Sequence, residues 1–218
     1  MLKIDILQKL RTAGIVAIVR ESTEAHALSV AQACIDGGIT ALEIAYTTPG
    51  AMRVLETLRT TNPQVLLGAG TVLDAETARI AILSGAQFII SPAVNADTIR
   101  LCNRYQIAAL PGAMTPTEIV TAMEAGADFV KVFPADTLGP AYIKSLRGPL
   151  PHAPLMPTGG VTRDNLADWF AAGSVAVGVG SSLTSTAKAA DYAGIVSTAR
   201  GFIERMNEIR AEASRPTV

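Results

Sequence analysis

Residues 125–134 read AGADFVKVFP. In this stretch a small-residue turn is followed at once by an apolar run, a pattern that predicts a helix end leading directly into a buried strand. A small-residue turn of the same kind recurs at three other places, with its glycine at Gly38, Gly85 and Gly173. Together with Gly126, these glycines lie 47, 41 and 47 residues apart, so each interval holds two strand–helix units. Glycine at a helix end accepts the positive φ that turns the chain into the next strand. The recurrence predicts one supersecondary unit that is used repeatedly.

Outward from that stretch, short apolar runs alternate with longer helical patterns along the chain. Eight runs are predicted to be strands: Gly14–Arg20, Ala41–Tyr46, Leu66–Val72, Phe88–Pro92, Ala108–Gly112, Phe129–Pro134, Pro154–Gly160 and Ala176–Ser181. Helices are predicted at Glu24–Asp36, Ala75–Leu83, Pro116–Ala125 and Asn165–Ala172, and a last helix is predicted at about 191–212. Residues 1–13 are expected to form an N-terminal helix, and residues 213–218 a frayed tail.

Eight strand–helix units with nearly continuous apolar strands favour a closed parallel barrel, so we expect one α/β domain over residues 1–218, a (β/α)8 or TIM barrel. The alternative is an open doubly wound sheet, which usually carries a glycine-rich fingerprint after its first strand. The first strand here ends in Val19-Arg20-Glu21, without glycine. The run Gly68-Ala69-Gly70 has Leu73 where the third glycine would stand. The barrel is therefore the predicted fold.

The composition excludes several classes of protein. The chain has 218 residues, 17% of them charged, and a formal net charge of −1, so it carries no basic field for nucleic acid or an anionic membrane. No apolar run approaches the roughly 18 residues needed to span a bilayer, and the N-terminal sequence is not that of a signal peptide. Cys34 and Cys102 are predicted to be buried helix residues, as in a protein of the reducing cytoplasm. His26 and His152 have no partner at ligand spacing, so no protein-bound metal is expected.

Lys131 is the first candidate for chemistry, because active sites of such barrels form at the C-terminal ends of the strands. Side chains alternate along a strand, so Lys131 shares a face with Phe129 and Phe133, and Val130 and Val132 take the other face. If the valines pack on the outer helices, Lys131 points into the barrel, where an ammonium group is unfavourable unless it is paired or neutral. A neutral amine is a nucleophile towards ketones. The alternative is a lysine that reaches the rim or forms a structural ion pair.

Glu43 is the second candidate, a lone acid in the apolar strand 41–46. It has the same parity as Ala41, Ala45 and Thr47. An inward carboxyl group among small residues suits a general base. The alternative is a structural ion pair with a lysine or arginine inside the barrel.

Glycine-rich turns end the last two predicted strands, at residues 158–160 and 178–181. Exposed N–H groups in such turns bind anions, and the loops after the seventh and eighth strands hold phosphate in many barrels. The alternative is a simple steric need for small residues. Arg20 suits a bidentate contact with a carboxylate or phosphate unless it pairs with Glu21 or Glu43. Thr71 suits a hydrogen bond to a substrate carboxylate.

Together these residues resemble the class I 2-keto-3-deoxy-6-phosphogluconate (KDPG) and 4-hydroxy-2-oxoglutarate (KHG) aldolase family. The resemblance extends from about residue 5 to about residue 205 and is specific because several motifs keep their order and spacing. The motifs are GIVAIVR (14–20), LEI (42–44), GAGTV (68–72), ISP (90–92), LPGAMTP (110–116), VKVFP (130–134) and PTGG (157–160).

The resemblance implies a cytoplasmic (β/α)8 homotrimer that needs no metal or other cofactor and acts on a small 2-keto acid. It implies that Lys131 forms a Schiff base and that Glu43 is the acid–base residue. The other residues to which it gives a role in substrate binding are Arg20, Thr71, Pro92 and Phe133 and, at the phosphate end, Gly159, Gly160, Gly180 and Ser181.

Thr47 departs from the family pattern, because some members carry an arginine at this place, four residues after the glutamate. Thr47 stays a substrate-binding candidate, and the choice among keto acids stays open. The predicted reaction is reversible cleavage of KDPG to pyruvate and glyceraldehyde 3-phosphate, or of KHG to pyruvate and glyoxylate. The alternatives are cleavage of the galactonate epimer of KDPG, a phosphosugar isomerase or phosphate-binding synthase, and a non-catalytic barrel that binds a phosphorylated ligand.

Overall fold

The computed structural model describes residues 2–213, in which helices and strands alternate. The elements are α1 (Lys3–Ala13), β1 (Ile15–Val19), α2 (Glu24–Asp36), β2 (Ala41–Ala45), α3 (Ala51–Thr61), β3 (Leu66–Gly70), α4 (Ala75–Leu83), β4 (Phe88–Ile90), α5 (Ala96–Arg104), β5 (Ala108–Leu110), β6 (Gly112–Ala113), α6 (Pro116–Glu124), β7 (Val130–Val132), α7 (Gly139–Leu146), β8 (Leu155–Pro157), α8 (Leu166–Ala171), β9 (Val177–Val179), α9 (Ser181–Thr184), a short 3-10 helix (Ala187–Ala189) and α10 (Tyr192–Ala213).

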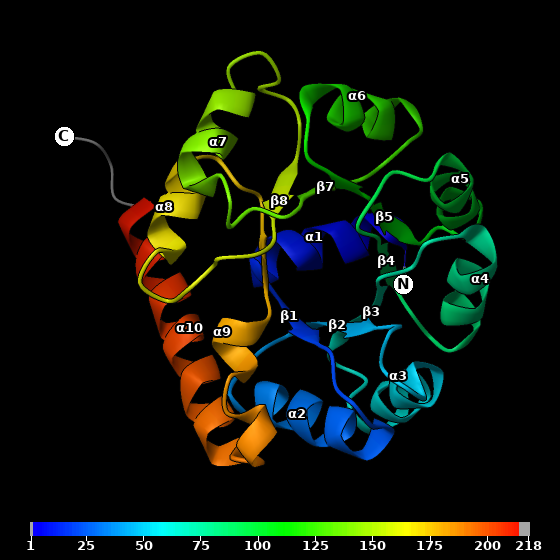
Figure 1. Ribbon diagram of the computed structural model, residues 1–218, viewed down its shortest axis with the longest axis vertical. Helices are drawn as coiled ribbons and strands as arrows, with labels where there is room; N and C mark the ends of the chain where they lie inside the picture. Colours follow the sequence, from blue (N-terminus) through cyan, green and yellow to red (C-terminus); the bar gives the residue numbers. More distant parts are fainter. Residues whose placement is uncertain (1, 214–218) are drawn as a thin grey trace.

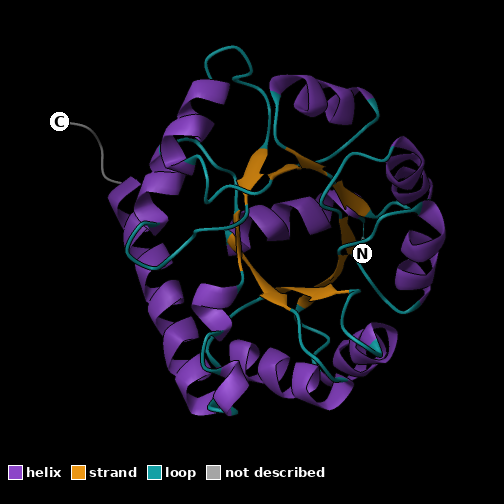
Figure 2. Cartoon of the chain, in the orientation of Figure 1, coloured by secondary structure: helices purple, strands orange, loops and turns teal. Residues whose placement is uncertain are grey.

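The strands form a closed ring, with α1 lying across it and the other helices around it (Figures 1 and 2). Six strands lie in the order β5-β4-β3-β2-β1-β9 and three in the order β6-β7-β8, and all neighbours are parallel. A bridge between Thr158 and Gly178 joins the β8 end to the β9 end. At the other seam, the Lys131 N–H donates to the Pro111 carbonyl over 2.9 Å. The predicted parallel barrel is confirmed.

The predicted fifth strand, residues 108–112, is split at Pro111. Proline has no N–H to give to a strand ladder. On one side of it β5 pairs with β4, and on the other side β6 pairs with β7. At this split the chain therefore passes from one sheet to the other, and the barrel stays closed.

The predicted strands were also too long at their ends. Gly14 caps α1 with a φ of 71°, and Ser181 begins α9 instead of ending a strand. Thr158 follows β8 as an isolated bridge to Gly178, and a bend at Gly159 and Gly160 comes after it. Gly14 is buried and its carbonyl accepts from the Val177 N–H, so a strand-like pattern extends into the cap of α1, whereas Ser181 is exposed. The assigned ends of an element commonly shift by one or two residues.

The predicted helices lie within a residue or two of the observed ones. Ala125 caps the end of α6, and Asn165 and Ala172 flank α8. Ala213 is the last residue of α10, so its assignment to a frayed tail was wrong; residues 214–218 lie outside the described part of the chain. Cys34 and Cys102 are buried in α2 and α5, as predicted.

The recurrent turns behave as the sequence predicted. Gly38, Gly85, Gly126 and Gly173 have φ between 96° and 100°. In this region an L side chain is strained, which explains the glycine at each turn from helix to strand.

Two apolar cores lie on the two sides of the barrel wall. The outer core joins the strands to the surrounding helices and includes Val130 and Val132. The inner core fills the barrel and includes Phe88 and Phe129. Helix α1 contributes Ile6 and Leu10 to the inner core, and Figure 1 shows it lying across the ring. Because α1 leads directly into β1, it closes the N-terminal end of the barrel and leaves the C-terminal end for a site.

Candidate active site

Lys131 lies inside the barrel, as the strand alternation predicted. Its neighbours Val130 and Val132 belong to the outer core, and Phe129, on its own face, belongs to the inner core. The Lys131 side chain is 5% exposed, and its Nζ lies 4.9 Å from the centroid of the Phe133 ring. Phe133 follows β7, so the amine lies towards the C-terminal end of the barrel.

Glu43 also points inward, from β2. Its neighbours Leu42 and Ile44 belong to the outer core, whereas Ala41 belongs to the inner core. Glu43 is 1% exposed, and within residues 2–213 neither carboxyl oxygen has a hydrogen-bond partner. Burying a carboxyl group without partners is unfavourable, and such groups concentrate at functional sites. No protein donor occupies its lone pairs.

Within residues 2–213, Glu43 and Lys131 are the only charged residues that are buried. Their strands, β2 and β7, stand on opposite sides of the ring (Figure 1). No ion pair within 4.0 Å joins the two side chains in this part of the chain. The structural Glu–Lys pair considered from the sequence is therefore not formed, and the two groups face a common interior from opposite walls.

Arg20 and Thr71 meet at the rim. The Arg20 Nη2 donates to the Thr71 Oγ1 over 3.2 Å, although β2 lies between their strands. The Glu21 Oε2 lies 3.0 Å from the His26 Nδ1, and among residues 2–213 no ion pair within 4.0 Å joins Arg20 to Glu21 or Glu43, the pairs that the sequence left open. Thr71 has a φ of 57°, a strained conformation for this residue, and such strain clusters at functional sites.

Thr47 is exposed in the turn after β2. Its neighbour Thr48 is buried and accepts a hydrogen bond from the Glu21 N–H over 3.1 Å. The turn is therefore tied to the end of β1, where Arg20 lies.

Pro92 and Phe133 lie close to the lysine strand. An added Cβ on Gly112 would come within 2.3 Å of the Pro92 carbonyl group, so the Pro92 segment rests directly on Gly112. Gly112 is in turn the β6 partner of Lys131. Phe133 is 37% exposed and joined to Pro134 by a cis peptide bond. The structure thus brings these two predicted substrate-binding residues to the Lys131 side of the barrel.

The four residues predicted for the phosphate end also come together. Gly159 and Gly160 form a turn after β8 with φ of 105° and 69°, and Gly180 precedes α9, which begins at Ser181. The two turns are adjacent because β8 and β9 end side by side. The Ser182 hydroxyl donates to the Val161 carbonyl over 2.5 Å and fastens them together.

Two residues near these turns were absent from the predicted set. Thr158 is 4% exposed, and its hydroxyl has no partner within the described residues. Its position at the end of a predicted strand was the available signal. Asp136, in the loop after β7, places its carboxyl group beside Gly159, 3.5 Å from where a Cβ on that glycine would lie. Only the folded chain reveals this second contact.

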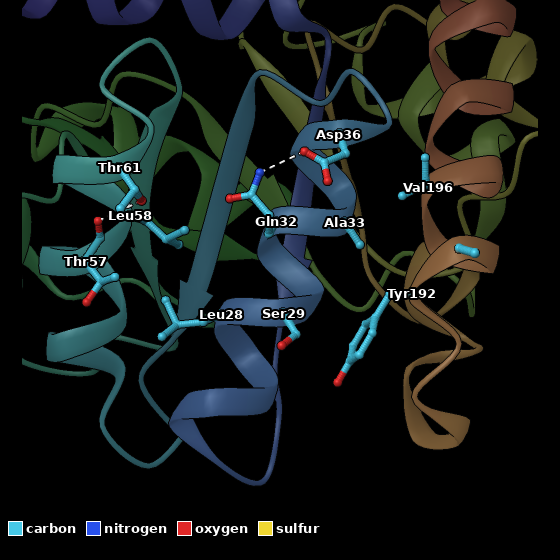
Figure 3. A pocket seen from close by; sticks show the side chains of 11 residues that line it. Leu28, Ser29, Gln32, Ala33, Asp36, Thr57, Leu58, Thr61, Tyr192 and Val196 are labelled. Atoms are coloured by element: carbon cyan, nitrogen blue, oxygen red, sulfur yellow. Dashed lines mark hydrogen bonds between the residues drawn. The ribbon is translucent and has the colours of Figure 1, made fainter.

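Other grooves lie away from the barrel interior. Figure 3 shows the one between α2, α3 and α10, with a volume of about 520 Å³. It is lined by residues such as Gln32, Thr57 and Tyr192, and it contains neither Lys131 nor Glu43. We place the candidate site in the barrel, because the buried ionisable groups are there. Within residues 2–213, no three His, Cys, Asp or Glu side chains gather to hold a metal ion, and no helix is long and apolar enough to cross a bilayer.

Comparison with known proteins finds similar sequences and structures. Residues 6–198 match the family model described as KDPG and KHG aldolase. The chain is 38% identical over 171 residues to the 2-dehydro-3-deoxy-6-phosphogalactonate aldolase of Escherichia coli K12, covering 78% of this chain and 83% of that protein. It is 35% identical to the 2-dehydro-3-deoxy-phosphogluconate aldolase of Pseudomonas aeruginosa, covering 92% of both chains.

A solved structure is similar throughout. The KDPG aldolase of Legionella pneumophila, with pyruvate captured as a covalent carbinolamine intermediate, superposes with a TM-score of 0.81 and 27% identity. The superposition covers 90% of this chain and 97% of that one.

Proposed function

Because the chain belongs to the KDPG and KHG aldolase family of class I 2-keto acid aldolases, we propose that Lys131 forms a Schiff base with a 4-hydroxy-2-keto acid and that Glu43 moves the protons. The observation that carries this proposal is the presence of two buried ionisable side chains, Glu43 and Lys131, on opposite walls of one barrel without a direct ion pair between them. A purely structural role would favour a direct ion pair between them.

The proposed reaction begins when the neutral amine of Lys131 attacks the C2 carbonyl carbon. Loss of water gives a protonated imine, which draws electrons from the C3–C4 bond. Glu43 takes the proton of the C4 hydroxyl, the C3–C4 bond breaks, and an aldehyde leaves. The remaining enamine takes a proton at C3 with help from Glu43, and water then hydrolyses the imine to release pyruvate and the free lysine.

We also propose a part in substrate binding for each rim residue. Pro92 and Phe133, on the Lys131 side, would line the pyruvate moiety, and the Arg20–Thr71 pair would hold the carboxylate. Thr47 stands at the same rim, where it offers a hydroxyl in place of a guanidinium group. With no arginine there, we expect Arg20 and Thr71 to provide most of the anchoring.

The preferred substrate that we propose carries a phosphate. Gly159, Gly160, Gly180 and Ser181 form adjacent turns whose backbone N–H groups would bind it. This use of local dipoles explains how a protein with a net charge of −1 would bind an anionic substrate. We therefore favour KDPG, with its galactonate epimer as the second candidate because the Escherichia coli relative is named for that substrate. KHG is the third candidate, without phosphate.

Trapping with pyruvate tests the Schiff base. The protein is incubated with pyruvate, reduced with borohydride and examined by mass spectrometry. We expect a single reduced adduct on Lys131, no adduct in Lys131→Ala, and an unchanged adduct in Lys144→Ala, whose lysine is exposed on α7. An adduct on another lysine, or none on the wild-type protein, would overturn the proposal.

Two kinetic measurements complete the test. Glu43→Gln should slow cleavage by about 10²- to 10⁴-fold and still form the pyruvate adduct, because proton transfer is lost but the amine is kept. The ratio of kcat/KM for KDPG, its galactonate epimer and KHG identifies the substrate, and a preference for KHG would refute the phosphate site. Equal cleavage rates in Glu43→Gln and wild type would remove Glu43 from the mechanism.

We also propose a cytoplasmic homotrimer. The unpaired and buried Cys34 and Cys102 are consistent with a reducing compartment. The designed cage that resembles this chain at 33% identity was built by fusing symmetric oligomeric domains, which supports self-assembly. Size-exclusion chromatography with light scattering measures the mass of the assembly. A trimer would give three times the chain mass of 22.7 kDa, and a monomer would give one chain mass.

A further inference from the structure

We propose that Gly70 is a positioning residue for Glu43: the missing side chain on β3 leaves the space in which the Glu43 carboxyl group is held. The proposal rests on the proposed function only in giving Glu43 a part in proton transfer. The contact between the two residues stands independently of that role.

The contact follows from the register of β2 and β3. Ala45 pairs with Gly70, and Glu43 pairs with Gly68, so the Glu43 side chain extends along β3 towards Gly70. A Cβ built on Gly70 would lie 1.8 Å from the Glu43 Oε1, 2.3 Å from its Cδ and 2.4 Å from its Cγ. These are the three nearest atoms, and all belong to Glu43. The carboxyl group therefore rests against the bare backbone of Gly70.

Packing against β3 positions this carboxyl group. Within residues 2–213 neither of its oxygens receives a hydrogen bond, and the side chain is 1% exposed. A partly buried carboxyl group elsewhere in the chain is held differently: the Asp128 Oδ2 accepts from the Ala109 N–H over 2.8 Å. Without such a donor, the shape of the β3 surface sets the position of the Glu43 carboxyl group.

The fold itself does not require glycine at position 70. Gly70 does not have a positive φ, so alanine suits its backbone. The three nearest atoms that an alanine methyl would meet all belong to the flexible Glu43 side chain, from its Cγ to its Oε1. To reach ordinary van der Waals contact the carboxyl oxygen would move by about 1.5 to 2 Å. Gly70→Ala should therefore fold but hold Glu43 in the wrong place.

The predicted result separates proton transfer from the other steps. A misplacement of about 1 Å at a reacting group costs roughly 10²-fold in rate, so we expect Gly70→Ala to lower kcat for cleavage by about 10²-fold. Its KM and its yield of reduced pyruvate adduct on Lys131 should stay within about two-fold of wild type, because the amine is on the opposite wall. A variant that is merely destabilised would not divide the steps in this way.

A double-mutant cycle tests whether Gly70 acts through Glu43. Once Glu43→Gln has removed the carboxyl group, adding Gly70→Ala should change kcat by less than about two-fold. Gly68→Ala is the matched control. Gly68 lies on the same strand as Gly70, but its methyl group would meet the Phe88 ring at 2.1 Å instead of Glu43. We expect Gly68→Ala to lower the urea midpoint of unfolding. In the double variant with Glu43→Gln, the two fold-changes in kcat should simply multiply, which means that the two positions are not coupled.

Three outcomes would overturn the proposal: a wild-type kcat in Gly70→Ala, a full additional 10²-fold loss in the double variant, or equal losses of adduct yield and kcat. If Gly70→Ala fails to fold, Glu43→Ala is added to it. Recovery of folding supports the contact, and continued failure refutes it. Absence of the pyruvate adduct in the wild-type protein would instead refute the proposed function.

Discussion

Asp128 joins elements at the N-terminal end of the barrel, which we call the barrel floor. Its removal should lower the free energy of unfolding by an amount that can be worked out from its contacts. Its Oδ2 lies 2.8 Å from the Lys3 Nζ of α1 and accepts from the Ala109 N–H of β5 at 2.8 Å. Both side chains of the ion pair are 13% exposed. The contact thus joins the helix that closes the barrel to the β5–β7 seam, three residues before Lys131.

Asp128→Ala removes both interactions at once. The Ala109 N–H, on a residue 2% exposed, loses its acceptor, and an unsatisfied buried donor costs about 1 to 3 kcal/mol. Lys3 keeps a hydrogen bond to the Asn103 Oδ1 but loses its counter-charge, which in a mostly buried setting brings the total to roughly 2 to 4 kcal/mol. For a chain of this length, this corresponds to a fall in Tm of about 4 to 16 °C.

The assay is urea unfolding followed by far-UV circular dichroism, with fixed m values. Lys3→Met removes the charge pair but leaves the Ala109 hydrogen bond, so it should cost less than Asp128→Ala. The matched control is Asp97→Ala, whose pair with Arg100 is exposed at both ends and should be worth below about 1 kcal/mol. If Asp128→Ala costs no more than Asp97→Ala, the view that this contact fastens the barrel floor is wrong.

Two further predictions concern charged side chains at the rim. The Glu118 carboxylate accepts from the N–H groups of Met114 and Thr115, which hold its pKa below 4.5. Glu118→Gln should therefore lower the urea midpoint at neutral pH. The difference between the variant and the wild type should disappear as the pH falls from 4.5 through the lower pKa of Glu118 in the folded protein. A constant difference down to the acid limit would contradict this. Asp136→Asn removes a negative charge beside Gly159, so KM for a phosphorylated substrate should fall by about three-fold while KM for KHG stays unchanged. Equal changes in both KM values would show that Asp136 does not face the phosphate.

Much of the fold was available from local patterns. The helix–glycine–strand turns predicted the repeated unit, and the observed φ values of Gly38, Gly85, Gly126 and Gly173 explain why glycine recurs there. The period of two along a strand placed Lys131 and Glu43 on the inner face, opposite to valines and leucines that pack outside. Strand ends were predicted less well, because the apolar pattern does not mark where a neighbouring helix ends or begins: Gly14 is buried yet caps α1, and Ser181 is exposed and begins α9.

The amino-acid sequence by itself determined the alternation of elements, the closure expected of eight parallel strands, and the inward direction of the two charged side chains. These properties depend on backbone geometry over a few residues. Only the tertiary structure decided which residues meet across strands: Arg20 with Thr71, Asp136 with Gly159, and the Glu43 carboxyl group with Gly70. Such contacts depend on the stagger between neighbouring strands of a closed barrel and on the paths of the loops, and no short stretch of sequence encodes either.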